Sequence, residues 1–432
     1  MRLFLVIACL LIFTAKAFAR VKTNEAYLLL DPTQKVINIL KKNPELSFDH
    51  PTKTTLEVYG PRGTGQFLRS LNLTAFEMRS KTKSYLSEYP TPEEIEEKIF
   101  TLAESHPEII HIEQIGTSLQ GRPITAVKIS DHPTTDEIEP EVKYIANMHG
   151  DEIVGRELMV LLIEELATKY KSGNPKIRSL VDTTEIYIVP SMNPDGANAK
   201  RRGNSDWIDL NRDFPDFTTR DNQNDSHGRE EETKSIMEWQ AKRNFSLSAN
   251  FHGGAEVVNY PWDTTADEHP LHAHVLELSK QYANQVPGMR DSTEFPGGVV
   301  NGYDWYEVNG GMQDWSYYWH NDLQVTIELS NKKWPRYSEI ARYWEENKIA
   351  LVDFLSQVHQ GIGLRLTPSD KFVSISKDGQ HIGVFPVHNN EFHKVLPEGV
   401  YTISVLDENR SEKKKIKQSV KKSSSFKKYI SL

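Results

Sequence analysis

The chain has 432 residues, of which 38% are hydrophobic and 26% charged, and its formal net charge is −9. A chain of this length usually divides into two or three domains, and the composition is that of a soluble globular protein. Nucleic-acid-binding proteins usually carry a basic surplus. The acidic balance therefore argues against nucleic acid as the main partner.

The first 19 residues have the features of a secretory signal. Arg2 provides the positive start, an apolar stretch follows over residues 3–13, and residues 17–19 form a small-residue cleavage site. No later stretch reaches the ~20 apolar residues that a transmembrane helix needs. Cys9, the only cysteine, lies inside this segment, where a lipid anchor is a weaker alternative. We expect a secreted or periplasmic protein without a thiol, which leaves histidines and carboxylates as metal ligands.

Residues 20–82 form an N-terminal extension with mixed local signals. A helical pattern over residues 34–42 is followed by a short strand at 55–59 and an apolar run over 67–78. Two interpretations stay open. The extension is either a small propeptide-like α/β element or an extended segment that wraps around the next domain.

Residues 83–362 alternate between helical and strand patterns, which is typical of a mainly parallel, mixed α/β sheet flanked by helices. Residues 91–94 combine a capping box with proline at the first helical position, and they predict the start of a helix. Ligands of open α/β sheets bind beyond the carboxyl ends of the strands, so polar clusters at such ends predict one common site. Four predicted strands lead into such clusters: 143–148 into His149, 185–189 into Asn193, 246–251 into His252, and 324–327 into Glu328.

Residues 363–432 predict a small antiparallel β module. Short alternating strands are expected at 363–366, 372–376, 383–387 and 400–406, with turn residues between them. The end of the chain is rich in lysine from Lys413 to Lys428. These lysines could bind an anionic membrane or wall polymer. We favour the alternative, in which they protect an exposed sheet edge from aggregation.

Two polar clusters could contribute to a metal site. His149 and Glu152 stand three residues apart at a predicted strand-to-helix corner, where both side chains can face one ion. A catalytic zinc uses three protein ligands and an open position, and two histidines with one glutamate are a common set. His252, followed by two glycines, has close backbone access to a ligand, although an isolated histidine of this kind is more often structural.

Three further clusters carry groups that could act on a substrate. Asn211 and Arg212 form a pair that can hold a carboxylate, although a polar surface loop with ordinary salt bridges is the favoured interpretation of this cluster taken alone. Residues 301–315 combine glycines with aromatic side chains, which suits a mobile lid or a packed aromatic loop. Glu328 lies in a predicted strand with apolar neighbours and is a candidate general base; a strand-edge glutamate paired with lysine is the alternative.

In their order along the chain, these clusters resemble the zinc carboxypeptidases of the carboxypeptidase A/B family. The motifs follow one another as HxxE, NPDG, DLNRDFP, FHGG, WYxxxGGMQDW and a late glutamate. Their sequences are most similar to those of the regulatory branch, which includes carboxypeptidases E, N, M and D. The resemblance covers residues 85–360. Residues 396–401 are similar to the transthyretin-like β sandwich that follows the catalytic domain in that branch. Residues 20–82 have no clear counterpart there.

The resemblance implies one zinc ion per chain and assigns its surroundings. His149, Glu152 and His252 are the implied ligands, and Asp209 is implied to hold His149 in its metal-binding tautomer. Glu328 is the implied general base. It takes a proton from a zinc-activated water and passes it to the leaving amine.

The resemblance also implies how a peptide is held. Arg202 polarises the scissile carbonyl and stabilises the oxyanion, while Asn211 and Arg212 bind the terminal carboxylate. Tyr306 closes over the terminal residue. These roles describe an exopeptidase that acts at the last peptide bond.

Two further positions imply the specificity. Asp263 and Gln313 match the residues that line the terminal side-chain pocket in the branch that cleaves after basic residues. A buried carboxylate favours a terminal Lys or Arg, because an apolar side chain would leave it unpaired. We therefore expect a monomeric enzyme acting on peptides or proteins that end in Lys or Arg. The alternatives are an exported enzyme that trims cell-wall peptides, and a non-catalytic binding protein on the same fold.

Overall fold

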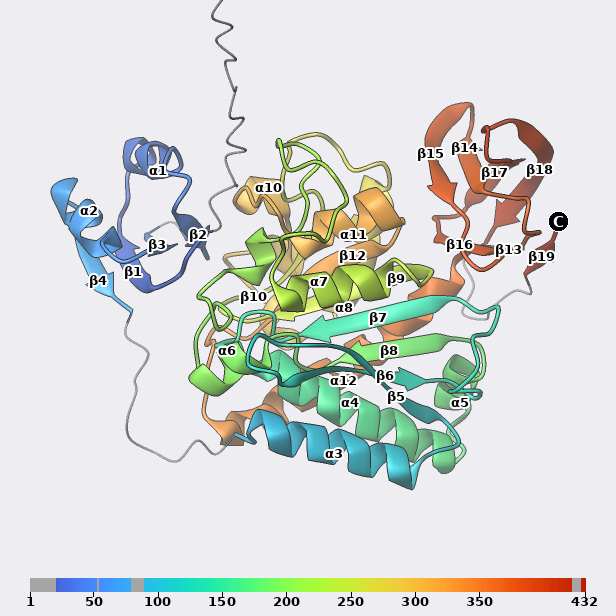
Figure 1. Cartoon of the computed structure of the whole chain (residues 1–432), viewed down its shortest axis with the longest axis horizontal. Helices are drawn as coiled ribbons and strands as arrows, with labels where there is room; N and C mark the ends of the chain where they lie inside the picture. Colours follow the sequence, from blue (N-terminus) through green and yellow to red (C-terminus); the bar gives the residue numbers. More distant parts are fainter. Residues whose placement is uncertain (1–20, 53, 79–88, 422–428) are drawn as a thin grey trace, which may run out of the picture.

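The computed structural model describes residues 21–52, 54–78, 89–421 and 429–432. The predicted signal lies outside the described residues, as do Lys427 and Lys428. Figure 1 shows three parts: an N-terminal unit (residues 21–78), a central unit (residues 89–360) and a β module (residues 361–432). Within the described ranges, we find no helix with the length and apolar character needed to cross a membrane.

The N-terminal unit is a small α/β element. Alternate residues of its strands, such as Tyr27 and Leu29, are buried, and with residues of both helices they form a separate apolar core. The antiparallel sheet has the order β2-β3-β1-β4. Its elements are β1 (Glu25–Leu30), α1 (Gln34–Leu40), β2 (Ser47–Asp49), β3 (Thr55–Gly60), α2 (Thr64–Ser70) and β4 (Ala75–Glu77).

The central unit is built on an eight-stranded mixed sheet with the order β11-β10-β12-β9-β7-β8-β6-β5. Its middle strands are buried on both faces, as expected for a parallel sheet covered by helices. The pairs β10–β11, β12–β9, β9–β7 and β7–β8 are parallel, and the other three are antiparallel. The strands are β5 (Ile110–Thr117), β6 (Pro123–Ile129), β7 (Glu141–Ala146), β8 (Glu185–Val189), β9 (Phe245–His252), β10 (Glu256–Tyr260), β11 (Val299–Asn301) and β12 (Leu323–Leu329).

Helices cover both faces of this sheet (Figure 1), so the predicted fold class is confirmed. One face packs against α4 (Val154–Lys171), α8 (His272–Ala283) and α12 (Ile340–Ser356), and the other against α7 (Glu231–Gln240) and α11 (Met312–His320). The helix predicted at residue 91 is α3 (Pro92–Ser105), and its capping box is present. The short helices are α5 (Pro175–Val181), α6 (Pro194–Ala199), α9 (Pro287–Arg290), α10 (Gly302–Trp305), and the 3₁₀ turns η1 (Leu210–Arg212), η2 (Pro296–Gly298), η3 (Tyr337–Glu339) and η4 (Gln357–His359).

The β module consists of a three-stranded sheet, β16-β13-β19, and a four-stranded sheet, β15-β14-β17-β18. Its first strand begins at Gly361, two residues before the boundary that we expected at 363. The lysine-rich segment forms β18 at the edge of the larger sheet, an arrangement that fits edge protection. The strands are β13 (Gly361–Arg365), β14 (Phe372–Lys377), β15 (Gln380–Pro386), β16 (Glu391–Val395), β17 (Gly399–Leu406), β18 (Glu412–Val420) and β19 (Ile430–Ser431).

Candidate functional site

Three neighbouring strands deliver the central residues of the site. The strands β7, β9 and β12 are adjacent and parallel, so their carboxyl ends meet at one edge of the sheet. His149 follows the end of β7, and His252 is the last residue of β9. Glu328 in β12 pairs in register with His252. The sheet therefore brings together side chains that are separated by up to 179 positions in the sequence.

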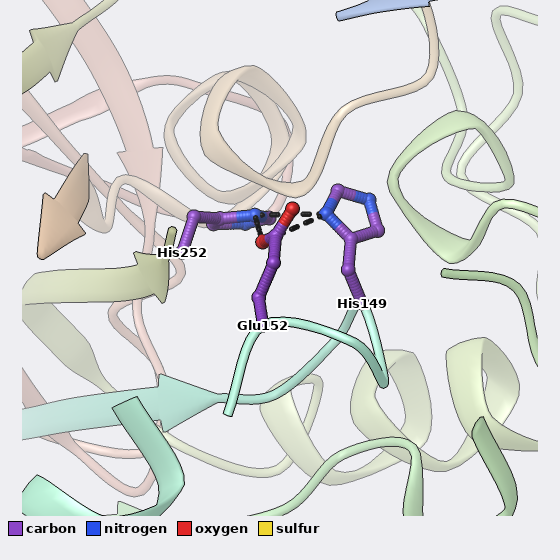
Figure 2. Close-up of side chains that lie close together, drawn as sticks. All are labelled: His149, Glu152 and His252. Carbon is purple, nitrogen blue, oxygen red and sulfur yellow. Dashed lines mark hydrogen bonds and ion pairs between the residues drawn. The ribbon is translucent and has the colours of Figure 1, made fainter. Parts of the chain in front are cut away.

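A buried cluster of His149, Glu152 and His252 lies at this edge (Figure 2). The Nδ1 atoms of the two histidines are 3.0 Å apart, and Oε2 of Glu152 lies 3.1 Å from His149 Nδ1 and 2.8 Å from His252 Nδ1. Two imidazole nitrogens and one carboxylate oxygen thus point into the same small volume. This donor set is the one that catalytic zinc sites use, so the residues fit a zinc ion.

Asp209 fixes the orientation of the His149 ring. Its Oδ1 lies 3.0 Å from His149 Nε2, which can donate a proton there and leave Nδ1 free as a metal ligand. Burial opposes ionisation of Asp209, but the Arg202 guanidinium and the His149 ring hold its pKa well below the usual range. The carboxylate therefore stays charged and keeps the ring in place.

Two arginines bring positive charge to the site. Arg202 is buried, donates from Nε to Asp209 Oδ2 at 2.9 Å, and lies 3.4 Å from Glu152 Oε1. Arg212 ends η1 and donates to the carbonyl of its neighbour Asn211 at 2.8 Å. The Asn211 amide oxygen accepts from the N–H of Met312 at 3.1 Å, which joins this turn to α11.

The predicted specificity residues form a buried cluster. Gln313 and Asn259 donate from their amides to Asp263 Oδ1 at 2.9 and 3.1 Å. Burial raises the pKa of Asp263 to about 7. Gly302 packs so closely that an added Cβ would lie 1.6 Å from Asp263 Oδ1, so only glycine fits here.

Asp314 is part of this cluster, although the sequence alone gave it no role. Its Oδ2 accepts the backbone N–H groups of Asp263 and Thr264 at 2.8 and 2.9 Å. It therefore holds the backbone of the pocket carboxylate in place. Asp314 could have been predicted from the sequence, because it stands next to Gln313 in the GGMQDW motif.

Three further residues lie in the site, although no sequence pattern predicted a role for them there. Asp49 and His50 come from the N-terminal unit, and Lys333 follows β12. The Tyr306 hydroxyl donates to Asp49 Oδ1 at 2.8 Å, and Lys333 Nζ lies 3.0 Å from Asp49 Oδ2. The hydroxyl of Tyr306 therefore contacts a residue of the N-terminal unit in the same chain.

Comparisons with known proteins agree with this geometry. The family model described as zinc carboxypeptidase matches residues 95–350. Carboxypeptidase M of Mus musculus is 35% identical over 352 residues, which cover 73% of this chain and 77% of that protein. The carboxypeptidase N catalytic chain of Homo sapiens is 35% identical over 346 residues, which cover 69% of this chain and 76% of that protein. Carboxypeptidase D of Mus musculus is 39% identical over 300 residues, which cover 60% of this chain and 21% of that protein.

Solved structures share the fold at low sequence identity. The crystal structure of thrombin activatable fibrinolysis inhibitor matches with a TM-score of 0.60 and 15% identity, covering 77% of this chain and 98% of that one. The crystal structure of the carboxypeptidase A from Helicoverpa armigera matches with a TM-score of 0.60 and 16% identity, covering 78% of this chain and 97% of that one.

Proposed function

The chain belongs to the zinc carboxypeptidase family, and from this premise we propose that it releases a single C-terminal lysine or arginine from peptides or proteins. It is a metallocarboxypeptidase whose cofactor is zinc. The observation that carries the proposed specificity is the buried Asp263, which is placed by Gln313 and Asn259. A terminal ammonium or guanidinium would pair with this carboxylate, whereas an apolar side chain would leave it without a counter-charge.

The proposed mechanism gives the chain's residues separate tasks. His149, Glu152 and His252 would hold the zinc ion, which would supply a Lewis acid that polarises the carbonyl and acidifies water. Glu328 removes a proton from the attacking water and delivers it to the leaving amine. The carboxylate is buried and lies beside His252 in the sheet, which supports this role.

The remaining groups hold the peptide. We assign Arg202 to the developing oxyanion, because a charged donor in a buried site stabilises negative charge strongly. Asn211 and Arg212 hold the terminal carboxylate, and a guanidinium matches its two oxygens. Tyr306 closes over the terminal residue. This anchoring confines cleavage to the last bond of the chain. We also propose that the enzyme is exported, on the basis of the signal-like segment at residues 1–19.

A substrate panel tests the reaction and its specificity. For this test a recognition site for a specific protease is inserted between residues 78 and 89, because Asp49 of the N-terminal unit contacts Tyr306. The protein is cut there, and the central unit with its β module is separated from the N-terminal unit. We expect release of free Lys or Arg with kcat/KM about 100-fold above that for peptides ending in Ala or Phe. A chelator should abolish the release, and added zinc should restore it.

The same panel separates the rival functions. Faster cleavage of muropeptides than of simple Lys-ending peptides would favour wall trimming. A zinc-loaded protein that binds these peptides but releases no amino acid would be a binding protein, and the proposed enzyme function would be wrong.

A further inference from the structure

Three carboxylates, which we call the junction carboxylates, lie where the central unit meets the β module. They are Asp136, in the loop before β7, Glu141, the first residue of β7, and Glu391, the first residue of β16. One oxygen of each lies within 4.8 Å of the other two. Figure 1 shows the amino end of β7 turned toward the β module, whereas His149 follows the carboxyl end of this strand. The group is therefore separate from the zinc cluster.

A tight turn in the β module places Glu391 against the central unit. Asn389 and Asn390, between β15 and β16, have φ values of +48° and +63°, in the left-handed region that asparagine tolerates better than most residues. The N–H of Glu391 donates to the His388 carbonyl at 2.9 Å and closes the turn. The Asn389 amide also donates to Asp136 Oδ2 at 3.1 Å. The turn therefore positions two of the three carboxylates.

Asn244, the residue before β9, connects the two buried carboxylates. Its N–H donates to Glu141 Oε2 at 2.6 Å, and its side-chain amide donates to Glu391 Oε1 at 2.8 Å. The second oxygen of each carboxylate, Glu141 Oε1 and Glu391 Oε2, is buried and has no hydrogen-bond partner among the described residues. Each buried carboxylate thus keeps one oxygen available to a ligand.

Basic side chains do not neutralise this group. Within the described part of the chain, no lysine or arginine forms an ion pair with it. Arg243, whose charge acts on Glu141, donates to Glu113 at 2.8 Å, and Arg365, whose charge acts on Glu391, is exposed. Burial raises the pKa of Glu141 well above its usual range and that of Glu391 to about 8, and neighbouring carboxylates add to both effects. Buried carboxyl groups that face one another need either protons or a cation.

The donor set suits calcium. All three side chains offer carboxylate oxygens, which are the ligands that Ca²⁺ prefers, and the group contains no histidine or cysteine of the kind that binds zinc. Asp136 is exposed, so water can reach an ion here and complete its ligand shell. Mg²⁺ needs near-ideal octahedral geometry, which is harder to reach with ligands from two parts of the fold.

A second acidic group in the same loop needs no ion. Asp131, His132 and Glu137 also have ligand atoms within 4.8 Å of one another. The His132 ring is exposed, and its Nδ1 lies 2.9 Å from Glu137 Oε2. Because the imidazole already pairs with this carboxylate, the group is explained as a surface contact.

From this geometry we propose that Asp136, Glu141 and Glu391 bind one Ca²⁺ ion, which joins the β module to the central unit. The ion contributes stability, because a ligand that binds only the folded chain favours that state. The proposal does not depend on the proposed peptidase function, since the two sites lie at opposite ends of β7.

The test is calorimetric titration of the full, zinc-loaded and calcium-free chain with CaCl₂ at pH 8. We expect one ion per chain, with a Kd of about 10⁻⁴–10⁻³ M, as in extracellular calcium-binding modules. Mg²⁺ should bind at least about tenfold more weakly, and equal binding would exclude a calcium-specific site. A folded, zinc-loaded chain that binds no calcium would overturn the proposal, and protons would then neutralise the group.

Asp136→Asn and Glu137→Gln form a matched pair. Each replaces a carboxylate by its amide in the same loop, but only Asp136 belongs to the proposed site. Asp136→Asn should weaken calcium binding at least about tenfold, whereas Glu137→Gln should leave it unchanged. The reverse result would place the ion at His132 and contradict the proposal. Zinc content and peptide hydrolysis should be the same in both variants, so a failure of the peptidase function is seen separately.

Glu391→Gln tests the contribution of the β module. Without calcium it should unfold at a temperature no lower than wild type, because it removes one of several carboxylates that repel one another. Addition of CaCl₂ to about 10 mM should raise the Tm of wild type by about 2–4 °C and leave that of Glu391→Gln unchanged. An equal rise in both would show that Glu391 is not a ligand. Asp136→Asn provides the same comparison at an exposed position, where folding is not at risk.

Discussion

Replacing Glu328 by Gln lowers kcat of the separated central unit by about 10³-fold or more, in the range expected for loss of a general acid–base group. The amide has nearly the same shape but cannot accept a proton from water. Because Glu328 is not among the three residues of the metal cluster, the variant should still bind one zinc ion per chain. Steady-state hydrolysis of a Lys-ending peptide, with metal analysis of the same sample, measures both quantities.

Glu256→Gln is the matched control for this variant. Glu256 lies on β10, next to β12, and pairs in register with Leu329. The change removes a carboxylate from the same region of the sheet without altering the proposed base, so kcat should stay within about twofold of wild type. A Glu328→Gln protein that keeps its zinc and turns over at the wild-type rate would exclude Glu328 as the base.

Preference for a basic terminal residue should depend on pH through Asp263. Burial raises the pKa of this carboxyl group to about 7. Two charged groups face it: Arg212, which lowers this pKa, and Asp314. The ionised form, which binds a cationic side chain, is therefore depleted as the pH falls below 7. We expect the ratio of kcat/KM for Lys-ending over Ala-ending peptides to fall with decreasing pH, by up to about tenfold per unit.

This ratio cancels any effect of pH on the catalytic step that both substrates share. In Asp263→Asn the ratio should become independent of pH, and kcat/KM for the Lys-ending peptide should fall by about 100-fold at pH 8, where the wild-type carboxylate is ionised. Hydrolysis of the Ala-ending peptide should change little. Asp267→Asn is the control, since Asp267 is exposed and close in sequence. A ratio that stays high in Asp263→Asn would show that another group selects the basic side chain.

The sheet, and the meeting of polar side chains at one of its edges, could be predicted because their signals are local. His149, His252 and Glu328 each stand in or just after an apolar strand, and parallel strands bring such positions to one edge. Gln313 and Asp263 came only from the resemblance to a known family. The cluster that they form depends on tertiary packing, including the close approach of Gly302.

The docking of the N-terminal unit could not be predicted in the same way. Asp49 and its partner Arg202 are 153 positions apart, and nothing in residues 47–51 is periodic or resembles a motif. The strand β16 was also missed, and β18 was expected only as a lysine-protected sheet edge, without bounds. Lys394 in β16 is buried, and β18 is an edge strand in which lysines replace the alternating apolar pattern. For Asp49 the deciding contact comes from a distant part of the chain, whereas β18 pairs with the strand just before it, β17.

The zinc content of purified protein tests the central claim most directly. Metal analysis should find one zinc ion per chain in wild type and in the exposed-histidine control His227→Ala, and much less than one in His149→Ala and His252→Ala. Full zinc occupancy after loss of either cluster histidine would contradict the account, because the ion would then be bound elsewhere.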